Sequence, residues 1–210
     1  MVFILVIMYI VCFDLEGVFT PEVWIAVSKA TGIDDLKLTT RDVSDYDVLM
    51  KNRIAILKKN NITIKDIQEI ISNMDLLPGA KEFLDYIRSV AQVVILTDSF
   101  VEFVMLFMKK LDFPMCFCHN LEINEEGIIT DYKIRISEMK KKTVLAFKKL
   151  NYEVIAAGDS YNDVSMLLEA NHGILFRPPK NVVEKFPEFP VVNEYDELKD
   201  LISKYLGFSD

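Results

Sequence analysis

The sequence places two carboxylates directly after its first apolar run. Residues 9–13 have high strand propensity, and Asp14, Glu16 and Gly17 follow them. A buried carboxylate is costly unless it is paired or bound to a cation, and side chains two residues apart on an extended chain point to the same side. We therefore expect Asp14 and Glu16 to face one site, next to a glycine that lets the backbone turn or approach a ligand. Taken alone, the stretch is equally typical of a strand followed by an acidic turn.

Two later apolar runs end in the same way. The polar side chains that follow them are Thr97, Asp98 and Ser99 in the first case, and Asp159, Asn162 and Asp163 in the second. Because the carboxyl ends of neighbouring parallel strands open on one crevice, we expect all three strand ends to meet there. So many carboxylates would repel each other unless a cation lay among them. Oxygen ligands without a nearby histidine suit Mg²⁺, which in proteins commonly serves a phosphate ligand.

These apolar runs alternate with segments of helical periodicity, which predicts an α/β fold with a doubly wound parallel sheet. Continuous apolar runs are typical of buried parallel strands, and we expect such strands at 9–13, 92–97, 154–159 and 173–176. The expected helices cover 20–31, 45–60, 63–74, 80–90, 99–111, 138–150, 162–170 and 195–206, with Thr20 and Ser99 as N-caps. A short strand at 115–118 and a β-hairpin formed by 121–124 and 128–134 complete the prediction.

The helices expected within residues 20–75 form an insertion after the first strand. This segment is too long for a simple crossover, so we divide the chain into a core of residues 1–19 and 76–210 and a helical cap of residues 20–75. The cap would cover the site as a lid. Arg53 lies on the apolar stripe of a cap helix, where it either extends along the surface, the commoner case, or clamps a substrate carboxylate.

The overall composition limits the kinds of partner. The 210 residues carry a net charge of −8, which argues against nucleic-acid and anionic-membrane partners and favours a small-molecule substrate held by a few placed cations. The three cysteines are too few for a disulfide framework, so we expect a cytoplasmic protein. The sequence does not decide between a monomer and a homodimer.

The N-terminal residues 2–13 are almost wholly apolar. The run is too short to span a bilayer, and it lacks the basic region and the cleavage site of a signal peptide. We interpret residues 1–7 as an upstream start or as an extension of the first strand.

Four ordered motifs in the chain resemble those of the haloacid dehalogenase-like phosphohydrolases. The matching segments are Asp14-Leu-Glu16-Gly17-Val18, Ile95-Leu96-Thr97, Lys140 and Gly158-Asp159-Ser160-Tyr161-Asn162-Asp163. The helical insertion resembles the cap of the phosphoserine phosphatase branch. Within that branch, the stretches D-L-E-G-V, T-T-R-D-x-x-D-Y-D-V-L-M-K and V-I-A-A-G-D-S-Y-N-D are most similar to a bifunctional phosphoserine phosphatase/homoserine phosphotransferase group. The resemblance covers residues 8–206.

This resemblance implies a covalent mechanism. Asp14 would be the nucleophile that forms an aspartyl phosphate. Glu16 would protonate the leaving oxygen and then deprotonate the incoming water or alcohol. Asp14, the backbone carbonyl of Glu16 and Asp159 would bind Mg²⁺, with Asp163 in support.

Other residues are expected to hold the substrate. The resemblance implies that Thr97 and Lys140 bind the phosphoryl group, although a lysine within a run of three is by itself more typical of a solvated helix face. Asp98 would bind a substrate ammonium group. Glu22 would do the same, or would only stabilise a helix N-terminus. Asn162 is also expected to contact the substrate.

We therefore predict an Mg²⁺-dependent enzyme that hydrolyses phosphoserine and also transfers its phosphoryl group to homoserine. Two alternatives are a phosphatase for another small phosphomonoester and a receiver-type signalling module that is phosphorylated on aspartate. Receivers are much shorter and carry no such insertion after the first strand. We interpret Cys116-x-Cys118-His119 as core packing rather than a metal site, because no second Cys or His cluster accompanies it.

Overall fold

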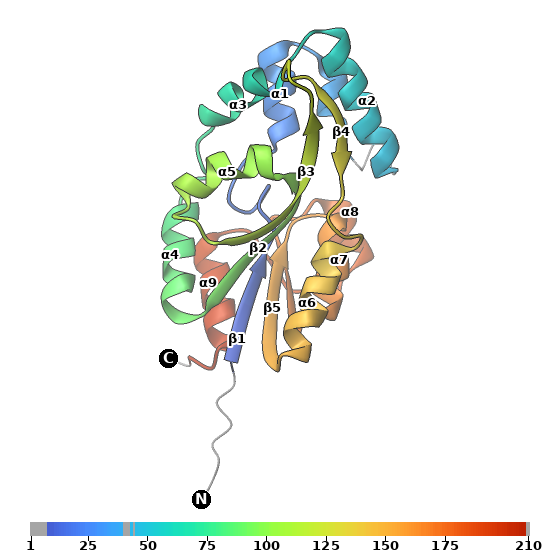
Figure 1. Cartoon of the computed structure of the whole chain (residues 1–210). Coiled ribbons are helices and arrows are strands. Elements are labelled where there is room, and N and C mark those ends of the chain that lie inside the picture. Colours follow the sequence, from blue (N-terminus) through green and yellow to red (C-terminus); the bar gives the residue numbers. More distant parts are fainter. Residues whose placement is uncertain (1–7, 40–42, 44, 209–210) are drawn as a thin grey trace, which may run out of the picture.

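A seven-stranded sheet forms the centre of the molecule (Figure 1). The computed structural model describes residues 8–39, 43 and 45–208. The strands are β1 Met8–Phe13, β2 Gln92–Phe100, β3 Met115–Ile123, β4 Ile129–Lys133, β5 Tyr152–Gly158, β6 His172–Phe176 and β7 Val191–Val192. They lie in the order β4-β3-β2-β1-β5-β6-β7, and all neighbours are parallel except the antiparallel pair β3 and β4. The predicted doubly wound parallel sheet with a hairpin is confirmed.

Alternate side chains of the central strands build two apolar cores, one on each face of the sheet. In β1, Val11 and Phe13 pack into one core, and Ile10 and Cys12 pack into the other. The helices that cover the first face are α4 (Ala80–Val90), α5 (Val101–Lys110) and α9 (Tyr195–Tyr205), and those on the second are α6 (Met139–Lys149), α7 (Tyr161–Glu169) and α8 (Lys180–Lys185). Because both faces are covered, the buried middle of each central strand is apolar, and polar residues occur toward its two ends.

The insertion after β1 lies beyond the carboxyl ends of the central strands (Figure 1). It consists of α1 (Val23–Thr31), the short 3₁₀ helix η1 (Asp34–Lys37), α2 (Tyr46–Lys59) and α3 (Ile64–Ser72). The β3–β4 hairpin reaches up to these helices and bonds to them. The N–H of Ile64 donates to the carbonyl of Gly127 at 2.8 Å, and Lys58 Nζ donates to the carbonyl of Thr130 at 3.2 Å. The hairpin therefore fixes the insertion over the end of the sheet that carries Asp14.

Two predicted helix starts are wrong. Thr20 does not cap α1; it forms an isolated β-bridge with Glu16, and α1 begins at Val23 after this tight turn. Ser99 does not cap α5, because β2 continues to Phe100 and pairs there with β3. Thr20 therefore belongs to the turn after β1, and Ser99 belongs to the extended end of β2.

The remaining differences concern short elements. The strand predicted at 115–118 and the first hairpin strand predicted at 121–124 form one strand, β3, which ends at Ile123. The elements η1, α8 and β7 were not predicted, since segments of two to six residues carry too little periodicity. The interpretation of residues 1–7 concerns residues outside those that the structure describes.

The cysteines lie in the core, as predicted. Cys118 is buried in the first apolar core and Cys116 packs against it, and both are free thiols, as is Cys12. Among the described residues, no helix has the length and apolar character needed to cross a membrane.

Candidate active site

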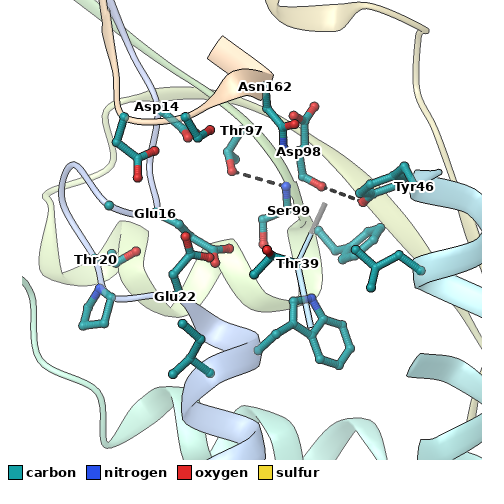
Figure 2. A pocket seen from close by; sticks show the side chains of 18 of the residues that line it. Asp14, Glu16, Thr20, Glu22, Thr39, Tyr46, Thr97, Asp98, Ser99 and Asn162 are labelled. Atoms are coloured by element: carbon teal, nitrogen blue, oxygen red, sulfur yellow. Dashed lines mark hydrogen bonds between the residues drawn. The ribbon is translucent and has the colours of Figure 1, made fainter. Parts of the chain in front are cut away.

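The carboxyl ends of β1, β2 and β5 open on one cavity of about 510 Å³. Residues of α1 and α2 in the insertion complete its wall (Figure 2). The predicted site residues that line the cavity are Asp14, Glu16, Glu22, Arg53, Thr97, Asp98, Lys140, Asp159 and Asn162. Of the predicted residues, Asp163 alone lies behind this wall, where it is fully buried.

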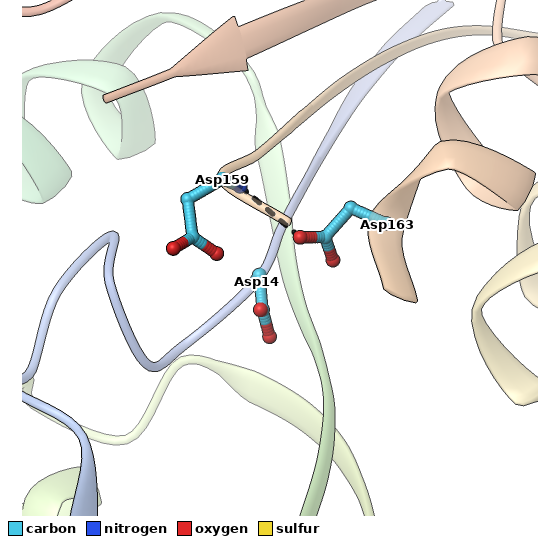
Figure 3. A group of neighbouring side chains, drawn as sticks. All are labelled: Asp14, Asp159 and Asp163. Carbon is cyan, nitrogen blue, oxygen red and sulfur yellow. Dashed lines mark hydrogen bonds between the residues drawn. The ribbon is translucent and has the colours of Figure 1, made fainter. Parts of the chain in front are cut away.

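Three aspartates form a compact cluster at one end of the cavity (Figure 3). One carboxylate oxygen from each of Asp14, Asp159 and Asp163 lies within 4.8 Å of the others. Asp14 directly follows β1, and its N–H donates to the carbonyl of Ala157 in β5 at 3.1 Å. This bond holds the two strand ends together. A buried donor set made only of oxygens fits a hard divalent cation such as Mg²⁺.

Asp163 orders this cluster from behind. Its Oδ2 accepts hydrogen bonds from the N–H of Asp159 at 3.1 Å and from the N–H and hydroxyl of Ser160, each at 3.0 Å. Its Oδ1 accepts a hydrogen bond from Lys140 Nζ at 2.7 Å. Because both oxygens have protein donors, Asp163 fixes the turn after β5 and thereby the place of Asp159.

Lys140 brings a positive charge into the cluster. Its Nζ lies 3.0 Å from Asp14 Oδ1, 2.7 Å from Asp163 Oδ1 and 3.6 Å from Asp98 Oδ2. It is 4% exposed, whereas Lys142, in the same run of lysines, is exposed. Burial lowers the pKa of a lysine, but the three carboxylates outweigh this, and the pKa of Lys140 is raised well above its usual range.

The charge of the cluster remains negative despite Lys140. Burial raises the pKa of Asp14 well above its usual range; Asp163 adds to the effect, and Lys140 opposes it. A nucleophilic carboxylate must be ionised, so the cluster needs further positive charge. A bound divalent cation would supply it.

Two glycines allow the backbone to approach the cluster. Gly17 has φ = +79°, and a Cβ at this position would lie 2.6 Å from Asp159 Oδ2. A Cβ on Gly158 would lie 2.3 Å from Asp163 Cγ. Any other residue at either position would displace a carboxylate of the cluster.

Glu16 and Glu22 point toward each other across the turn after β1 (Figure 2). Glu16 Oε2 accepts a hydrogen bond from the N–H of Val23 at 3.0 Å, at the start of α1. Burial, and then the neighbouring Glu22 carboxylate, raises the pKa of Glu16 to about 8. Glu16 is therefore protonated at neutral pH, which is the form that a general acid needs.

The end of β2 bulges toward the cavity. Between Leu96 and Phe100, three residues of β2 stand opposite Cys118 of β3. The bulged residues are Thr97, Asp98 and Ser99. Thr97 Oγ1 accepts the N–H of Ser99 at 3.2 Å, so its own hydroxyl proton is available to a ligand in the cavity (Figure 2).

Arg53 is buried in the cavity wall rather than extended along the surface. It is 6% exposed; its guanidinium lies over the Trp24 ring, 4.5 Å from the centroid, and Nη2 donates to the carbonyl of Leu38 at 2.6 Å. Its Nε has no hydrogen-bond partner, and among the described residues no carboxylate lies within ion-pair distance. Burial lowers the pKa of Arg53 to about 10, so the group stays charged at neutral pH. A buried, charged guanidinium with no anionic partner in the described part of the chain suits a carboxylate ligand.

Sequence reasoning gave no role to Tyr46 and interpreted His119 as core packing, but both residues contact Asp98. The hydroxyl of Tyr46, the first residue of α2, donates to the carbonyl of Asp98 at 3.1 Å (Figure 2). His119 Nε2 lies 3.6 Å from Asp98 Oδ1. The available signal for His119 was a polar residue directly after the short apolar run 115–118. Tyr46 gave no signal, because its role depends on how α2 meets β2.

Comparison with known proteins agrees with this geometry. The chain belongs to the haloacid dehalogenase-like hydrolases, whose family model matches residues 9–171. It is 53% identical over 192 residues to phosphoserine phosphatase ThrH of Pseudomonas aeruginosa, which covers 91% of this chain and 94% of that protein. It is 52% identical over 190 residues to a phosphoserine phosphatase of Pseudomonas syringae pv. tomato, over 90% of this chain and 80% of that one.

The fold also matches solved structures. A phosphoserine phosphatase solved as a phospho-aspartyl intermediate analogue has a TM-score of 0.75 and 18% identity, over 93% of this chain and 99% of that one. At this identity the match shows the shared fold. The receiver-type alternative is set aside, because the chain belongs to a hydrolase family and Asp14 follows β1 with a helical insertion after it.

Proposed function

We propose that this protein is a phosphoserine phosphatase that works through phosphorylation of Asp14. The observation that carries the proposal is the distribution of charge in one cavity. Asp14 and Lys140 form a reaction centre at one end, and the guanidinium of Arg53, which forms no ion pair with any residue that the structure describes, lies in the wall formed by the insertion. A small phosphomonoester that also carries a carboxylate complements both. The similarity to two phosphoserine phosphatases over most of the chain supports this substrate.

The chemistry follows from the positions of four side chains. Asp14 attacks phosphorus, so that a bond forms from its carboxylate oxygen while the bond to the serine oxygen breaks. Glu16, protonated at neutral pH, gives its proton to the leaving serine oxygen. It then takes a proton from a water that attacks the same phosphorus, which releases phosphate and restores Asp14. Lys140 and Thr97 bind the phosphoryl oxygens and offset the charge that develops on them.

The rest of the cavity would recognise the amino-acid part of the substrate. We assign the carboxylate to Arg53 and the ammonium group to Asp98 and Glu22. Asn162, in the first turn of α7, lines the same cavity and completes the polar wall. Binding energy from these groups would orient the phosphoryl group toward Asp14.

Mg²⁺ is the cation that the aspartate cluster fits best. Asp14, Asp159 and the backbone carbonyl of Glu16 would hold it, and Asp163 would keep Asp159 in place. When bound, Mg²⁺ supplies positive charge at the phosphoryl group. This assignment rests on the oxygen-only donors and on the raised pKa of Asp14.

At the level of the chain, we propose that residues 20–75 act as a substrate-specificity cap on a core made of residues 1–19 and 76–210. The hydrogen bonds between α2, α3 and the β3–β4 hairpin support a cap that is held over the cavity. We also propose a cytoplasmic location, which the three free thiols support.

Phosphate release by the purified protein tests the proposed substrate. We expect phosphoserine to give the highest kcat/KM in a panel that includes phosphothreonine, phosphoethanolamine and phosphorylated sugars. An Asp14→Asn variant serves as the blank for contaminating phosphatases. A higher kcat/KM for a phosphomonoester without a carboxylate would show that the protein is a phosphatase for another metabolite.

A further inference from the structure

A second cavity of about 270 Å³ lies beside the first, and a wall that includes Asp98 and Lys140 separates them. His119 lines this second cavity and is 3% exposed. It lies on β3, where it pairs with Phe100 at the end of the bulge that carries Asp98. The bulge therefore brings an imidazole behind the carboxylate that faces the substrate cavity.

The contacts of His119 define which ring nitrogen carries the proton. Nδ1 accepts the backbone N–H of Arg135 at 3.3 Å. An imidazole nitrogen that accepts a hydrogen bond carries no proton, so the proton of the neutral ring is on Nε2. Nε2 lies 3.6 Å from Asp98 Oδ1, so the ring presents its donor to that carboxylate.

Asp98 has protein contacts at its backbone carbonyl and at both carboxylate oxygens, and part of its side chain remains exposed. Its backbone carbonyl accepts the Tyr46 hydroxyl, and its Oδ2 lies 3.6 Å from Lys140 Nζ. Burial raises the pKa of Asp98, but Lys140 and His119 outweigh this and lower it overall, so the carboxylate is ionised. Its side chain is 35% exposed, which leaves it accessible from the cavity.

An ionised carboxylate so close to a phosphoryl site is unfavourable unless a cation from the substrate meets it. Lys140 does not fully serve this purpose, because it lies closer to Asp14 and Asp163 than to Asp98. An ammonium group on the substrate would complete the charge balance.

We propose that His119 is a positioning residue that holds Asp98 ready to accept a hydrogen bond from a substrate ammonium group. The pair would thereby give the cavity its preference for phosphoesters of amino compounds. Without the Nε2 donor, the Asp98 carboxylate would turn toward Lys140, its nearest cation, and the ammonium site would be lost. This inference rests on the proposed phosphatase function and adds to it a residue outside the substrate cavity.

Two variants with opposite hydrogen-bonding geometry test the inference. His119→Gln keeps a donor near the place of Nε2, whereas His119→Asn keeps an acceptor near Nδ1 and has no donor that reaches Asp98. Three substrates separate the contacts: phosphoserine, phosphoethanolamine, which has no carboxylate, and 3-phosphooxypropionate, which has no ammonium group. Steady-state kcat and KM are measured for each, and thermal unfolding confirms that each variant is folded.

We expect His119→Asn to raise KM for phosphoserine and phosphoethanolamine by about tenfold, because the donor that faces the Asp98 carboxylate is lost. Its KM for 3-phosphooxypropionate and all three kcat values should change by less than about twofold. His119→Gln should restore most of the lost affinity. If His119→Asn does not fold, His119→Phe, which keeps the ring volume, takes its place with the same expectation.

Equal losses on all three substrates would overturn the inference and mark His119 as a structural residue. A fall in kcat alone would also overturn it, since His119 would then act on the reaction through Lys140. Failure of the proposed function appears separately: wild-type protein that does not hydrolyse phosphoserine refutes that function, and the inference that rests on it, before any variant is compared.

Discussion

Among individual residues, burial and contact distinguish the side chains that act from those of the same type that do not. Lys140, Lys141 and Lys142 are adjacent in sequence. The fold buries Lys140 against Asp14 and leaves Lys142 exposed to solvent. Burial also decides the role of Arg53. Its place on the apolar stripe of α2 would allow the side chain to extend along the surface to solvent, but it packs on the ring of Trp24 in the cavity wall. Each becomes chemically useful because its charge is held where water cannot compensate it.

The aspartate cluster predicts a strict need for a divalent cation. Removal of metal with a chelator should abolish phosphatase activity, because Asp14, Asp159 and Asp163 then repel each other and Asp14 loses its ionised form. Mg²⁺ should restore the activity. Ca²⁺ should not, since it prefers more ligands and a looser geometry than in-line transfer tolerates. Full activity in protein shown to be metal-free by elemental analysis would refute the magnesium assignment.

Among the elements, the insertion and the turn after β1 have separate tasks. The insertion supplies Arg53 and Tyr46 to the cavity wall, and the β3–β4 hairpin bonds to it from the core. The turn after β1 instead supplies Glu16 and brings Gly17 against Asp159. Substrate choice and chemistry therefore depend on different segments, and mutations can separate them.

Loss of the cap arginine should affect recognition rather than chemistry. Arg53→Ala should lower kcat/KM for phosphoserine by a factor that corresponds to roughly 3–5 kcal/mol of transition-state stabilisation, the usual effect of removing one partner of a buried ion pair. The loss should appear mainly as a higher KM. The loss should be much smaller for phosphoethanolamine, which has no carboxylate. Lys51→Ala removes an exposed charge from the same helix and should leave both substrates unaffected. Equal losses on the two substrates would show that Arg53 only supports the packing of α2.

Gly17→Ala should damage the site itself. A methyl group at this position would meet Asp159 Oδ2 at 2.6 Å, so we expect kcat to fall by about tenfold or more through displacement of the carboxylate. Gly32→Ala is the matched control, because Gly32 has φ = +71° but no atom within 4 Å of the added Cβ. The control should lose about 1–2 kcal/mol of unfolding free energy and keep its activity. Equal activity of the two variants would contradict the close approach at Gly17.

For the whole molecule, the sequence predicted the parts that depend on local pattern. The apolar runs and the polar residues that follow them were enough to predict the sheet and the strand-end residues that line one cavity, whereas Lys140 was assigned to the site only through the family resemblance. The starts of α1 and α5 could not be predicted, because Thr20 and Ser99 are good caps whose tertiary contacts use them otherwise. His119 was interpreted as core packing, because its contact with Asp98 depends on a bulge in the pairing of β2 with β3 that the sequence does not reveal.

The cavity as a whole also predicts transfer of the phosphoryl group to an alcohol. Homoserine is serine with one more methylene, a difference typically worth only about 1–3 kcal/mol in recognition. Arg53 and Asp98 could hold its carboxylate and ammonium groups while Glu16 deprotonates its hydroxyl. Homoserine added to enzyme and phosphoserine should therefore give phosphohomoserine in competition with phosphate, as followed by ³¹P NMR. Release of phosphate alone at saturating homoserine would show that the protein is a simple phosphatase.

Trapping of the covalent intermediate is the most direct test of the central claim. Enzyme mixed with ³²P-labelled phosphoserine, quenched in acid within one turnover and digested, should carry label on the peptide that contains Asp14. Hydroxylamine should release this label, as expected for an acyl phosphate, and Asp14→Asn protein, checked for deamidation, should show neither label nor turnover. Turnover without label on Asp14, or label that is stable to hydroxylamine on a hydroxyl residue such as Thr97, would contradict the proposed mechanism.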